Sequence, residues 1–319
     1  GAILPSNSPG VHSLWIPALA LKIPVALKPG SQEPWTPMRI AQAMIAAGCP
    51  PEAFGFYPTD YSGATEILMR TQRSMLFGDE NTVRAWTEDR RVQIHGPGWS
   101  KVLLGDDQAD AWKDHLDVMA TSVAANGGRS CLNASGVWVP RHGREVAQAL
   151  AERLVTIDAR PLDDPHAAIA AFSRPEVAHR ISEYIDRNLT VPGATDLTDS
   201  LREGERVIEV DGCTFLRPTV VWCEDPEHPL ASAELLFPFV TVVEAPQSEM
   251  LERIGPTLVA TAITEDAAFR RELMRSRNVD RLNLGSIPTS KVSWDQPHEG
   301  NLFEHLYRQR AFQSEAATV

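Results

Sequence analysis

The sequence is poor in several residue types and patterns, and each shortage excludes a class of protein. Its 319 residues include four cysteines with no CxxC spacing, so we expect reduced thiols and a cytoplasmic location. Pro17, Lys22 and Pro24 interrupt the most apolar early stretch, which therefore falls short of the ~20 apolar residues of a membrane span. The first residues carry neither a basic segment nor a long apolar one, so no signal peptide is predicted.

Positive charge is also scarce. The chain has 30 Lys and Arg residues against 42 Asp and Glu residues, which gives a formal net charge of −12. A surface this acidic repels phosphate backbones and anionic lipids, so neither nucleic acid nor a membrane is an expected partner. The histidines form no ligand-spaced cluster with cysteines or acids, so no metal site is predicted. Any functional lysine must come from a short list: Lys22, Lys28, Lys101, Lys113 and Lys291.

The residues that are present describe an ordinary globular protein, 43% hydrophobic and 23% charged. In the first 100 residues, short apolar runs alternate with segments of helical spacing, which is typical of a parallel sheet covered by helices. The predicted strands are residues 25–28, 54–57 and 74–77, and the predicted helices are residues 12–21, 35–47 and 63–70.

A second α/β pattern begins after residue 100. Its predicted strands are residues 137–139, 220–222, 239–243 and 259–263, and its predicted helices are residues 109–124, 143–154, 167–172, 177–185 and 267–276. We therefore expect two α/β domains, one of residues 1–100 and one of residues 101–319.

Cys131 is the first candidate for chemistry. It follows a Gly-rich segment between a predicted helix and a predicted strand, where backbone N–H groups can converge on the atom that its sulfur attacks. Such donors would stabilise an oxyanion and lower the pKa of the thiol. Taken alone, a cysteine is more often a buried structural residue, and that role is expected of the other three.

Three further segments carry polar residues at places where α/β proteins bind ligands. Asn7 lies in a proline-bounded loop, Lys28 ends a predicted strand, and Glu234 precedes a predicted apolar strand. Each alone also fits a structural role, as a turn asparagine, a solvated lysine or a strand-boundary acid. Their order along the chain is more specific than any one of them.

In this order the segments resemble those of the aldehyde dehydrogenase superfamily. The matching motifs are Leu4 to Gly10 around Asn7, Leu27-Lys28-Pro29, Phe77-Gly78-Asp79, Gly128-Arg129-Ser130-Cys131, Glu234 to Pro238 and Arg281-Leu282-Asn283. The resemblance implies a Rossmann-like cofactor-binding domain over residues 1–100, without the family's N-terminal strands. A catalytic α/β domain would follow over residues 101–319, with its C-terminal segment returning toward the domain interface. Because family members are longer, we expect a fragment or a truncated product.

The resemblance also implies a covalent oxidation of an aldehyde to a carboxylic acid with NAD or NADP. Cys131 would be the nucleophile, and its backbone N–H and the Asn7 side chain would hold the oxyanion of a thiohemiacetal. Water would then hydrolyse the thioester. Lys28 would bind the adenosine ribose or a 2′-phosphate, and Glu234 the nicotinamide ribose. The implied partner is a small-molecule aldehyde, and whether helix faces form a homo-oligomer or pack internally stays open.

Three positions depart from the family pattern. His95 lies at or next to the place of the general-base glutamate, and it is either a base or a loop histidine bonded to the backbone. Ser31 replaces the acid that grips the adenosine ribose, so NADP is at least as plausible as NAD. After Gly78, Asp79 replaces a serine, and a carboxylate there caps a helix but repels a pyrophosphate.

These departures keep two other functions open. The Gly96-Pro97-Gly98 turn resembles that of the CoA-acylating branch, in which a thiol instead of water takes the acyl group. CoA is then a further partner, and reduction of an acyl-CoA is a further activity. The third alternative is a non-catalytic relative that keeps the fold as a binding or assembly module.

Overall fold

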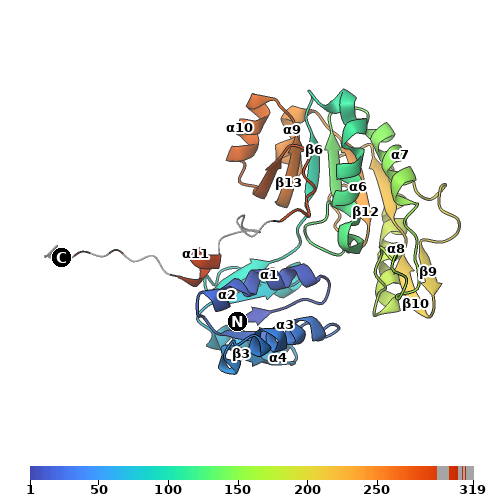
Figure 1. Cartoon of the computed structure of the whole chain (residues 1–319). Coiled ribbons are helices and arrows are strands. Elements are labelled where there is room, and N and C mark those ends of the chain that lie inside the picture. Colours follow the sequence, from blue (N-terminus) through green and yellow to red (C-terminus); the bar gives the residue numbers. More distant parts are fainter. Residues whose placement is uncertain (293–301, 308–310, 312, 314–319) are drawn as a thin grey trace. The chain divides into compact units, whose positions relative to one another are not determined.

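A computed structural model describes residues 1–292, 302–307, 311 and 313 of the chain (Figure 1). The chain forms two compact units. Unit 1 comprises residues 1–96 and the described residues after 292, and unit 2 comprises residues 97–292. Within the described residues, no helix is long and apolar enough to cross a membrane.

Unit 1 is built on a five-stranded parallel sheet of order β3-β2-β1-β4-β5. The strands are β1 (Ala2–Ile3), β2 (Val25–Lys28), β3 (Phe54–Phe56), β4 (Ser74–Phe77) and β5 (Val92–His95). The chain proceeds from β1 to one edge and then crosses to the other side. The carboxyl ends beside this reversal form the switch point at which open α/β sheets bind ligands.

Short helices connect these strands. They are α1 (His12–Trp15), α2 (Pro17–Ala20), α3 (Trp35–Ala46), α4 (Tyr61–Arg70) and α5 (Glu80–Val83). Pro17 separates α1 from α2, since its ring is tolerated as the first residue of a helix but not inside one. The Asp60 carboxylate caps α4 by accepting hydrogen bonds from the N–H groups of Ser62 (3.0 Å) and Gly63 (3.1 Å).

A helix from far along the chain, α11 (Leu302–Leu306), also packs in unit 1. Arg73 Nε donates to the His305 carbonyl at 2.7 Å, and His305 Nε2 lies 3.0 Å from the Ser74 carbonyl oxygen. Leu302 packs against the apolar cluster that contains Leu27. Unit 1 therefore takes residues from both sides of unit 2 in the sequence.

Unit 2 contains a seven-stranded sheet of order β14-β13-β6-β7-β12-β11-β8. The strands are β6 (Lys101–Leu104), β7 (Gly136–Val139), β8 (Ala194–Asp196), β11 (Thr219–Cys223), β12 (Phe239–Glu244), β13 (Thr257–Ile263) and β14 (Val279–Leu284). β8 runs antiparallel to β11, and the other neighbours pair in parallel. Every residue of β6, β7, β11 and β13 is buried, as expected of strands covered on both faces.

Helices cover both faces of this sheet (Figure 1). They are α6 (Leu116–Ala124), α7 (Gly143–Leu154), α8 (Pro175–Leu189), α9 (Gln247–Arg253) and α10 (Ala267–Arg275). α6 and α7 pack on one apolar cluster, and α8, α9 and α10 contribute to the other. In β6, Val102 and Leu104 face the first cluster and Leu103 faces the second, because side chains alternate along a strand.

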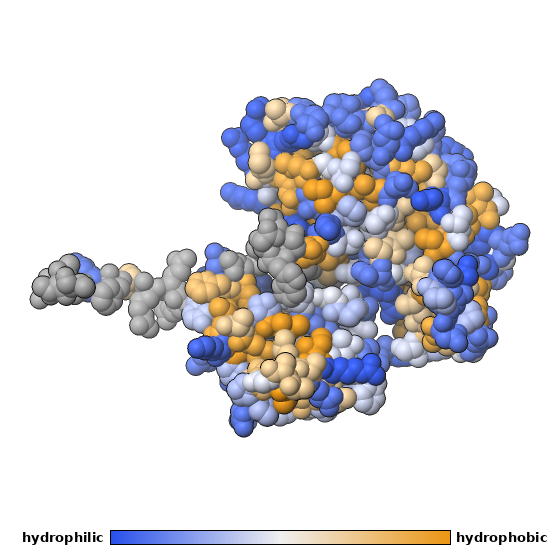
Figure 2. All heavy atoms as spheres, in the orientation of Figure 1, coloured by the Kyte–Doolittle hydropathy of each residue, from blue (hydrophilic) through white to orange (hydrophobic). Residues whose placement is uncertain are grey.

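Each apolar cluster draws its described residues from one unit. The helices of unit 2 present their polar faces outward, and Figure 2 shows mostly hydrophilic residues in the upper part of the view, where α10 and α7 lie in Figure 1. Each unit therefore has its own core.

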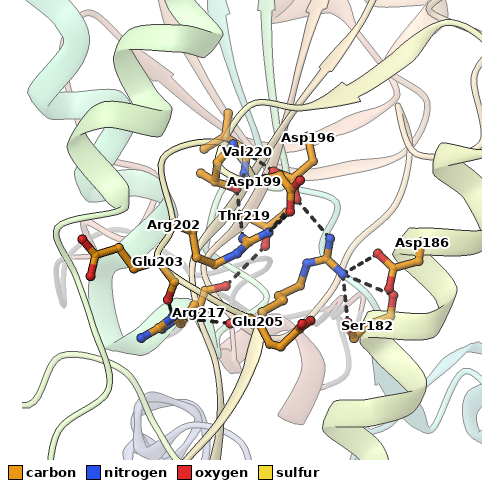
Figure 3. A network of polar contacts seen from close by, with 12 residues as sticks. Ser182, Asp186, Asp196, Asp199, Arg202, Glu203, Glu205, Arg217, Thr219 and Val220 are labelled. Carbon is orange, nitrogen blue, oxygen red and sulfur yellow. Dashed lines mark hydrogen bonds and ion pairs between the residues drawn. The ribbon is translucent and has the colours of Figure 1, made fainter.

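A separate antiparallel hairpin in unit 2 consists of β9 (Val207–Val210) and β10 (Cys213–Leu216). Buried charges anchor it (Figure 3). The Asp196 carboxylate accepts hydrogen bonds from Arg202 (3.1 Å) and Arg206 (3.0 Å), and Arg206 also donates to Asp186 of α8 at 2.8 Å. The three central side chains, Asp196, Arg202 and Arg206, are at most 6% exposed.

Most helices and strands indicated by the sequence are confirmed, and three need correction. The single helix predicted at 12–21 is divided into α1 and α2. The single helix predicted at 109–124 is wrong, because Ala111 leaves helical geometry within a 3-10 segment and α6 begins only at Leu116. The helix predicted at 167–172 is also wrong. Those residues are irregular, with a bend at Ile169, and Phe172 makes an isolated bridge to Thr214 of β10.

Candidate active site

Six of the sequence-predicted site residues lie along one edge of the unit 1 sheet. β1 to β5 are parallel, so their carboxyl ends meet at this edge. The residues are Asn7 after β1, Lys28 at the end of β2, Ser31 shortly after it, Gly78 and Asp79 after β4, and His95 at the end of β5. The structure thus brings the candidates of unit 1 to the carboxyl edge of its sheet.

Lys28 is half-buried at this edge. Burial lowers the pKa of its ammonium group, and the carboxylate of Asp60 acts in the opposite direction. Asp60 follows β3, the strand beside β2. A carboxylate that follows the neighbouring strand therefore partly restores the pKa of Lys28. Ser31 is exposed. The sequence reasoning missed Asp60, although an acid before a helix that follows a strand was a usable signal.

Asp79 caps the N-terminus of α5 at the same edge. Its carboxylate accepts a hydrogen bond from the Thr82 N–H at 2.8 Å, and the bonds to Thr82 lower its pKa. The predicted capping role is confirmed. A carboxylate at this position occupies a helix N-terminus that would otherwise favour an anion.

His95 lies at the end of a strand and not in a loop, which corrects one of its two predicted roles. The residue is 5% exposed. Its ring stacks on that of Phe77 at the end of β4, with centroids 4.3 Å apart and planes inclined by 9°. The ring is therefore held as a packed group between two strand ends.

In unit 2, Cys131 follows a turn with an unusual backbone conformation. Residues 126–128 all have positive φ, between 53° and 66°. At Gly128 a Cβ would lie 2.4 Å from the Phe237 carbonyl carbon and from the Pro238 nitrogen. Glycine is required there by both the conformation and the close contact. The contact fixes the turn against the segment that follows Glu234.

Asn133 holds the same turn from inside. Its side-chain N–H₂ donates to the carbonyls of Ser122 (3.1 Å) and Ala125 (2.9 Å), and its side-chain oxygen accepts from the Ser130 N–H at 2.9 Å. The residue is 6% exposed. The sequence reasoning missed Asn133, because an asparagine two positions after a candidate nucleophile shows no sign of what it will bond.

The pKa of the Cys131 thiol is raised to about 11, mainly by burial and secondly by the carboxylate of Glu234. Hydrogen bonds from the Ser130 side chain and from the backbone at Cys131 and Leu132 act in the opposite direction and are outweighed. The lowered thiol pKa expected from the sequence is therefore wrong. The donors are present, but the loss of hydration raises the pKa of the thiol more than their hydrogen bonds lower it.

Glu234 is bonded to the turn that precedes β6. Its carboxylate accepts hydrogen bonds from the N–H groups of Gly98, at 3.1 Å, and of Trp99. Burial raises its pKa, and these two bonds and the charge of Lys101 act against that rise. A groove of about 300 Å³ opens beside it, lined by Val177, Arg180, Ile181, Tyr184, Ala233, Glu234 and Leu235.

The same turn contacts Cys131. The Ser100 hydroxyl donates to the Cys131 carbonyl at 2.8 Å, and a Cβ on Gly98 would lie 2.0 Å from that oxygen. Cys131, Glu234 and residues 97–101 therefore form one cluster within unit 2, which we call the nucleophile cluster. Within the described residues, no group of three or more His, Cys, Asp or Glu side chains is placed to hold a metal ion.

The chain matches a known protein family over most of its length. The model described as the aldehyde dehydrogenase family matches residues 1–257. The chain is 28% identical over 303 residues to the α-ketoglutarate semialdehyde dehydrogenase of Haloferax volcanii, covering 89% of this chain and 60% of that protein. It is 27% identical over 262 residues to the aminoacetaldehyde dehydrogenase of Pseudomonas aeruginosa, covering 76% and 49%. The chain thus spans about half to three-fifths of the length of these relatives.

Solved structures share the fold. The γ-glutamyl-γ-aminobutyraldehyde dehydrogenase of Burkholderia cenocepacia superposes with a TM-score of 0.79 at 18% identity, covering 95% of this chain and 65% of that one. The NAD⁺ complex of an aldehyde dehydrogenase from Bacillus cereus superposes with a TM-score of 0.75 at 22% identity, covering 89% and 59%. At such identities the likeness shows a common α/β architecture.

Proposed function

The chain belongs to the aldehyde dehydrogenase family, and from this membership we propose that it oxidises an aldehyde to a carboxylic acid with NAD or NADP through a thioester on Cys131. The observation that carries the proposal is the placement of Cys131. It lies on a turn fixed by Gly128 and Asn133, with backbone donors at its sulfur. Donors so close to the sulfur can also serve an oxyanion that forms beside it.

In the first step, the Cys131 sulfur forms a bond to the aldehyde carbon. With a pKa of about 11 the resting thiol is protonated, so it passes its proton to a water molecule as the bond forms. The carbonyl electron pair moves to the oxygen, and the Cys131 N–H and the Asn7 amide donate to that oxyanion. A rigid turn favours this step, because the donors need no rearrangement as charge develops.

Bound NAD or NADP would supply the acceptor for the hydride that leaves the aldehyde carbon. Lys28 suits a ribose or 2′-phosphate, because a polar partner would offset the burial that lowers its pKa. Gly78 and Ser31 lie at the same edge. The negative charge of Asp79 would repel a nearby pyrophosphate. The Glu234 carboxylate accepts two backbone hydrogen bonds and has further lone pairs that can accept from the hydroxyl groups of the nicotinamide ribose.

In the last step, water attacks the thioester carbon and the C–S bond breaks, which releases the carboxylic acid and restores Cys131. We assign His95 as the base that takes the proton from the attacking water. A histidine can do this near neutral pH. The four cysteines are free thiols, which agrees with the reducing cytoplasmic location that we propose.

The proposal predicts a burst of reduced cofactor when an aldehyde is added to the protein with NAD⁺ or NADP⁺. Cys131→Ala should abolish the burst, because no thiohemiacetal can form. Cys213→Ala changes another partly buried cysteine of unit 2 and should leave it intact. Cofactor fluorescence measures the burst, and mass spectrometry of the quenched protein should find the acyl group on Cys131. A burst that survives in Cys131→Ala would refute the proposal.

The packing of His95 against Phe77 favours one second candidate, transfer of the acyl group to CoA. A thiol needs no activated water, so a base held within a stack is no obstacle to this route. It predicts turnover that depends on CoA, with acyl-CoA and no free carboxylate among the products. A chain that shows neither product would fit the third alternative, a binding or assembly module.

A further inference from the structure

Lys101 is a buried cation of unit 2 that the mechanism does not use. Lys101 begins β6 between Gly136 of β7 and Ala260 of β13, and it is 2% exposed. Lysine is almost never buried to this degree unless its charge is paired. We therefore expect the groups around the buried Lys101 ammonium to pair with its charge.

Two contacts tie Lys101 to the cluster. Its Nζ donates to the Trp99 carbonyl at 2.6 Å, while the N–H of the same Trp99 donates to the Glu234 carboxylate. Trp99 also has a positive φ of 43°, which is uncommon for a bulky residue. The strained backbone of Trp99 is thus held at its carbonyl by the Lys101 ammonium group and at its N–H by the Glu234 carboxylate. The adjacent Ser100 donates to the Cys131 carbonyl at 2.8 Å.

The negative charge of Glu234 opposes formation of the Cys131 thiolate. Glu234 raises the pKa of Cys131, so a thiolate would stand beside a second buried negative charge. Lys101 and Glu234 act on each other, and burial lowers the pKa of Lys101 to about 8. Other cations nearby have different positions: Arg180 lines the groove beside Glu234, and Arg129 lies over the Phe172 ring at 4.7 Å.

We propose that Lys101 is a positioning residue for Cys131. Its ammonium group offsets the negative charge that Glu234 places beside the thiol, and it holds residues 97–101 in the shape that contacts the nucleophile. The inference rests on the proposed function in so far as Cys131 is the nucleophile. Its effect is on the ionisation of the thiol, so it can be measured with neither cofactor nor aldehyde.

The test is the rate at which iodoacetamide alkylates Cys131 as a function of pH, read by peptide mass spectrometry of the full chain. Lys101→Met removes the charge at nearly constant length. We expect the midpoint of the thiol titration to rise by about one pH unit, which makes alkylation about tenfold slower at pH 8. Lys113→Met removes an exposed lysine of the same unit and should leave the profile unchanged.

A folded Lys101→Met protein with the wild-type midpoint would overturn the proposal. If that variant does not fold, Glu234→Gln is compared with the Lys101→Met/Glu234→Gln double variant, in which neither buried charge is left unpaired. The proposal expects Glu234→Gln to lower the midpoint and the added Lys101→Met to raise it again, so equal midpoints in these two variants would overturn it. A midpoint in Glu234→Gln that is not below wild type would overturn it. A wild-type protein that oxidises no aldehyde, while Lys101→Met still shifts the midpoint, would contradict only the proposed function.

Discussion

Two buried arginines, Arg202 and Arg206, depend on one carboxylate. Asp196 accepts a hydrogen bond from each and is itself 5% exposed at its side chain (Figure 3). Guanidinium groups stay charged at all ordinary pH values, so an arginine that loses its carboxylate partner cannot become neutral by releasing a proton. Residues of this kind determine stability more than the many exposed ion pairs of the chain do.

Asp196→Asn should therefore lower the free energy of unfolding of unit 2 by about 3 kcal/mol or more, because it leaves two buried cations without their shared partner. Asp199→Asn is the matched control. Asp199 also pairs with Arg202, but its side chain is 78% exposed, and its loss should cost less than about 1 kcal/mol. Denaturant titration followed by circular dichroism measures both values. Equal losses in the two variants would contradict this account of the network.

Single residues were predicted from the sequence only when a local motif marked them. Cys131 and Lys28 lie in recognisable segments, and the structure places each at an element end or turn, as such chemistry needs. Lys101 carries no such mark. Its partner Glu234 lies more than 130 residues away, and only the folded chain brings the two charges together. Contacts between side chains far apart in the sequence cannot be predicted from local sequence patterns.

At the scale of elements, the turn before Cys131 combines a backbone requirement with a packing requirement. Gly128→Ala should cost more than about 2 kcal/mol, because its Cβ would meet the backbone of Phe237 and Pro238 in addition to the cost of a left-handed alanine. The shifted turn should also change the alkylation rate of Cys131. Thermal unfolding and iodoacetamide labelling measure the two effects.

Gly255→Ala separates these causes. Gly255 has a similar φ of 64°, and a Cβ there meets nothing within 4 Å, so this variant carries only the conformational cost of about 1 kcal/mol. Its Cys131 should be labelled at the wild-type rate. If Gly128→Ala behaves like Gly255→Ala, the close contact with residues 237–238 does not hold the turn.

Elements were predictable where the apolar spacing agreed with the final burial. α7 matches its predicted bounds, and its apolar positions from Val146 to Leu154 are fully buried on one face. The prediction for 109–124 failed because spacing alone does not reveal the break at Ala111. The hairpin strands β9 and β10 are four residues each, and the residues of β9 are partly or fully exposed while three of β10 are buried in a row, so no alternation marks them in the sequence.

For the whole molecule, unit 2 is a continuous stretch of chain with two apolar clusters of its own. We expect residues 97–292, expressed alone, to fold with native-like secondary structure and to unfold cooperatively. Far-UV circular dichroism during thermal unfolding checks this, with the full chain as the control. A disordered spectrum for the isolated stretch would contradict the independence of its core.

Unit 1, in contrast, is interrupted in the sequence, and this affects the order in which the protein can fold during synthesis. α11 follows Gly96 by about 200 residues. At roughly 5–20 residues per second, the ribosome needs on the order of 10 to 40 s to make that stretch. During this interval the surfaces around Arg73 and Leu27 exist without α11, while unit 2 can already be complete. The nascent chain is then most exposed to wrong contacts on its earliest part, where a chaperone would have the longest time to act.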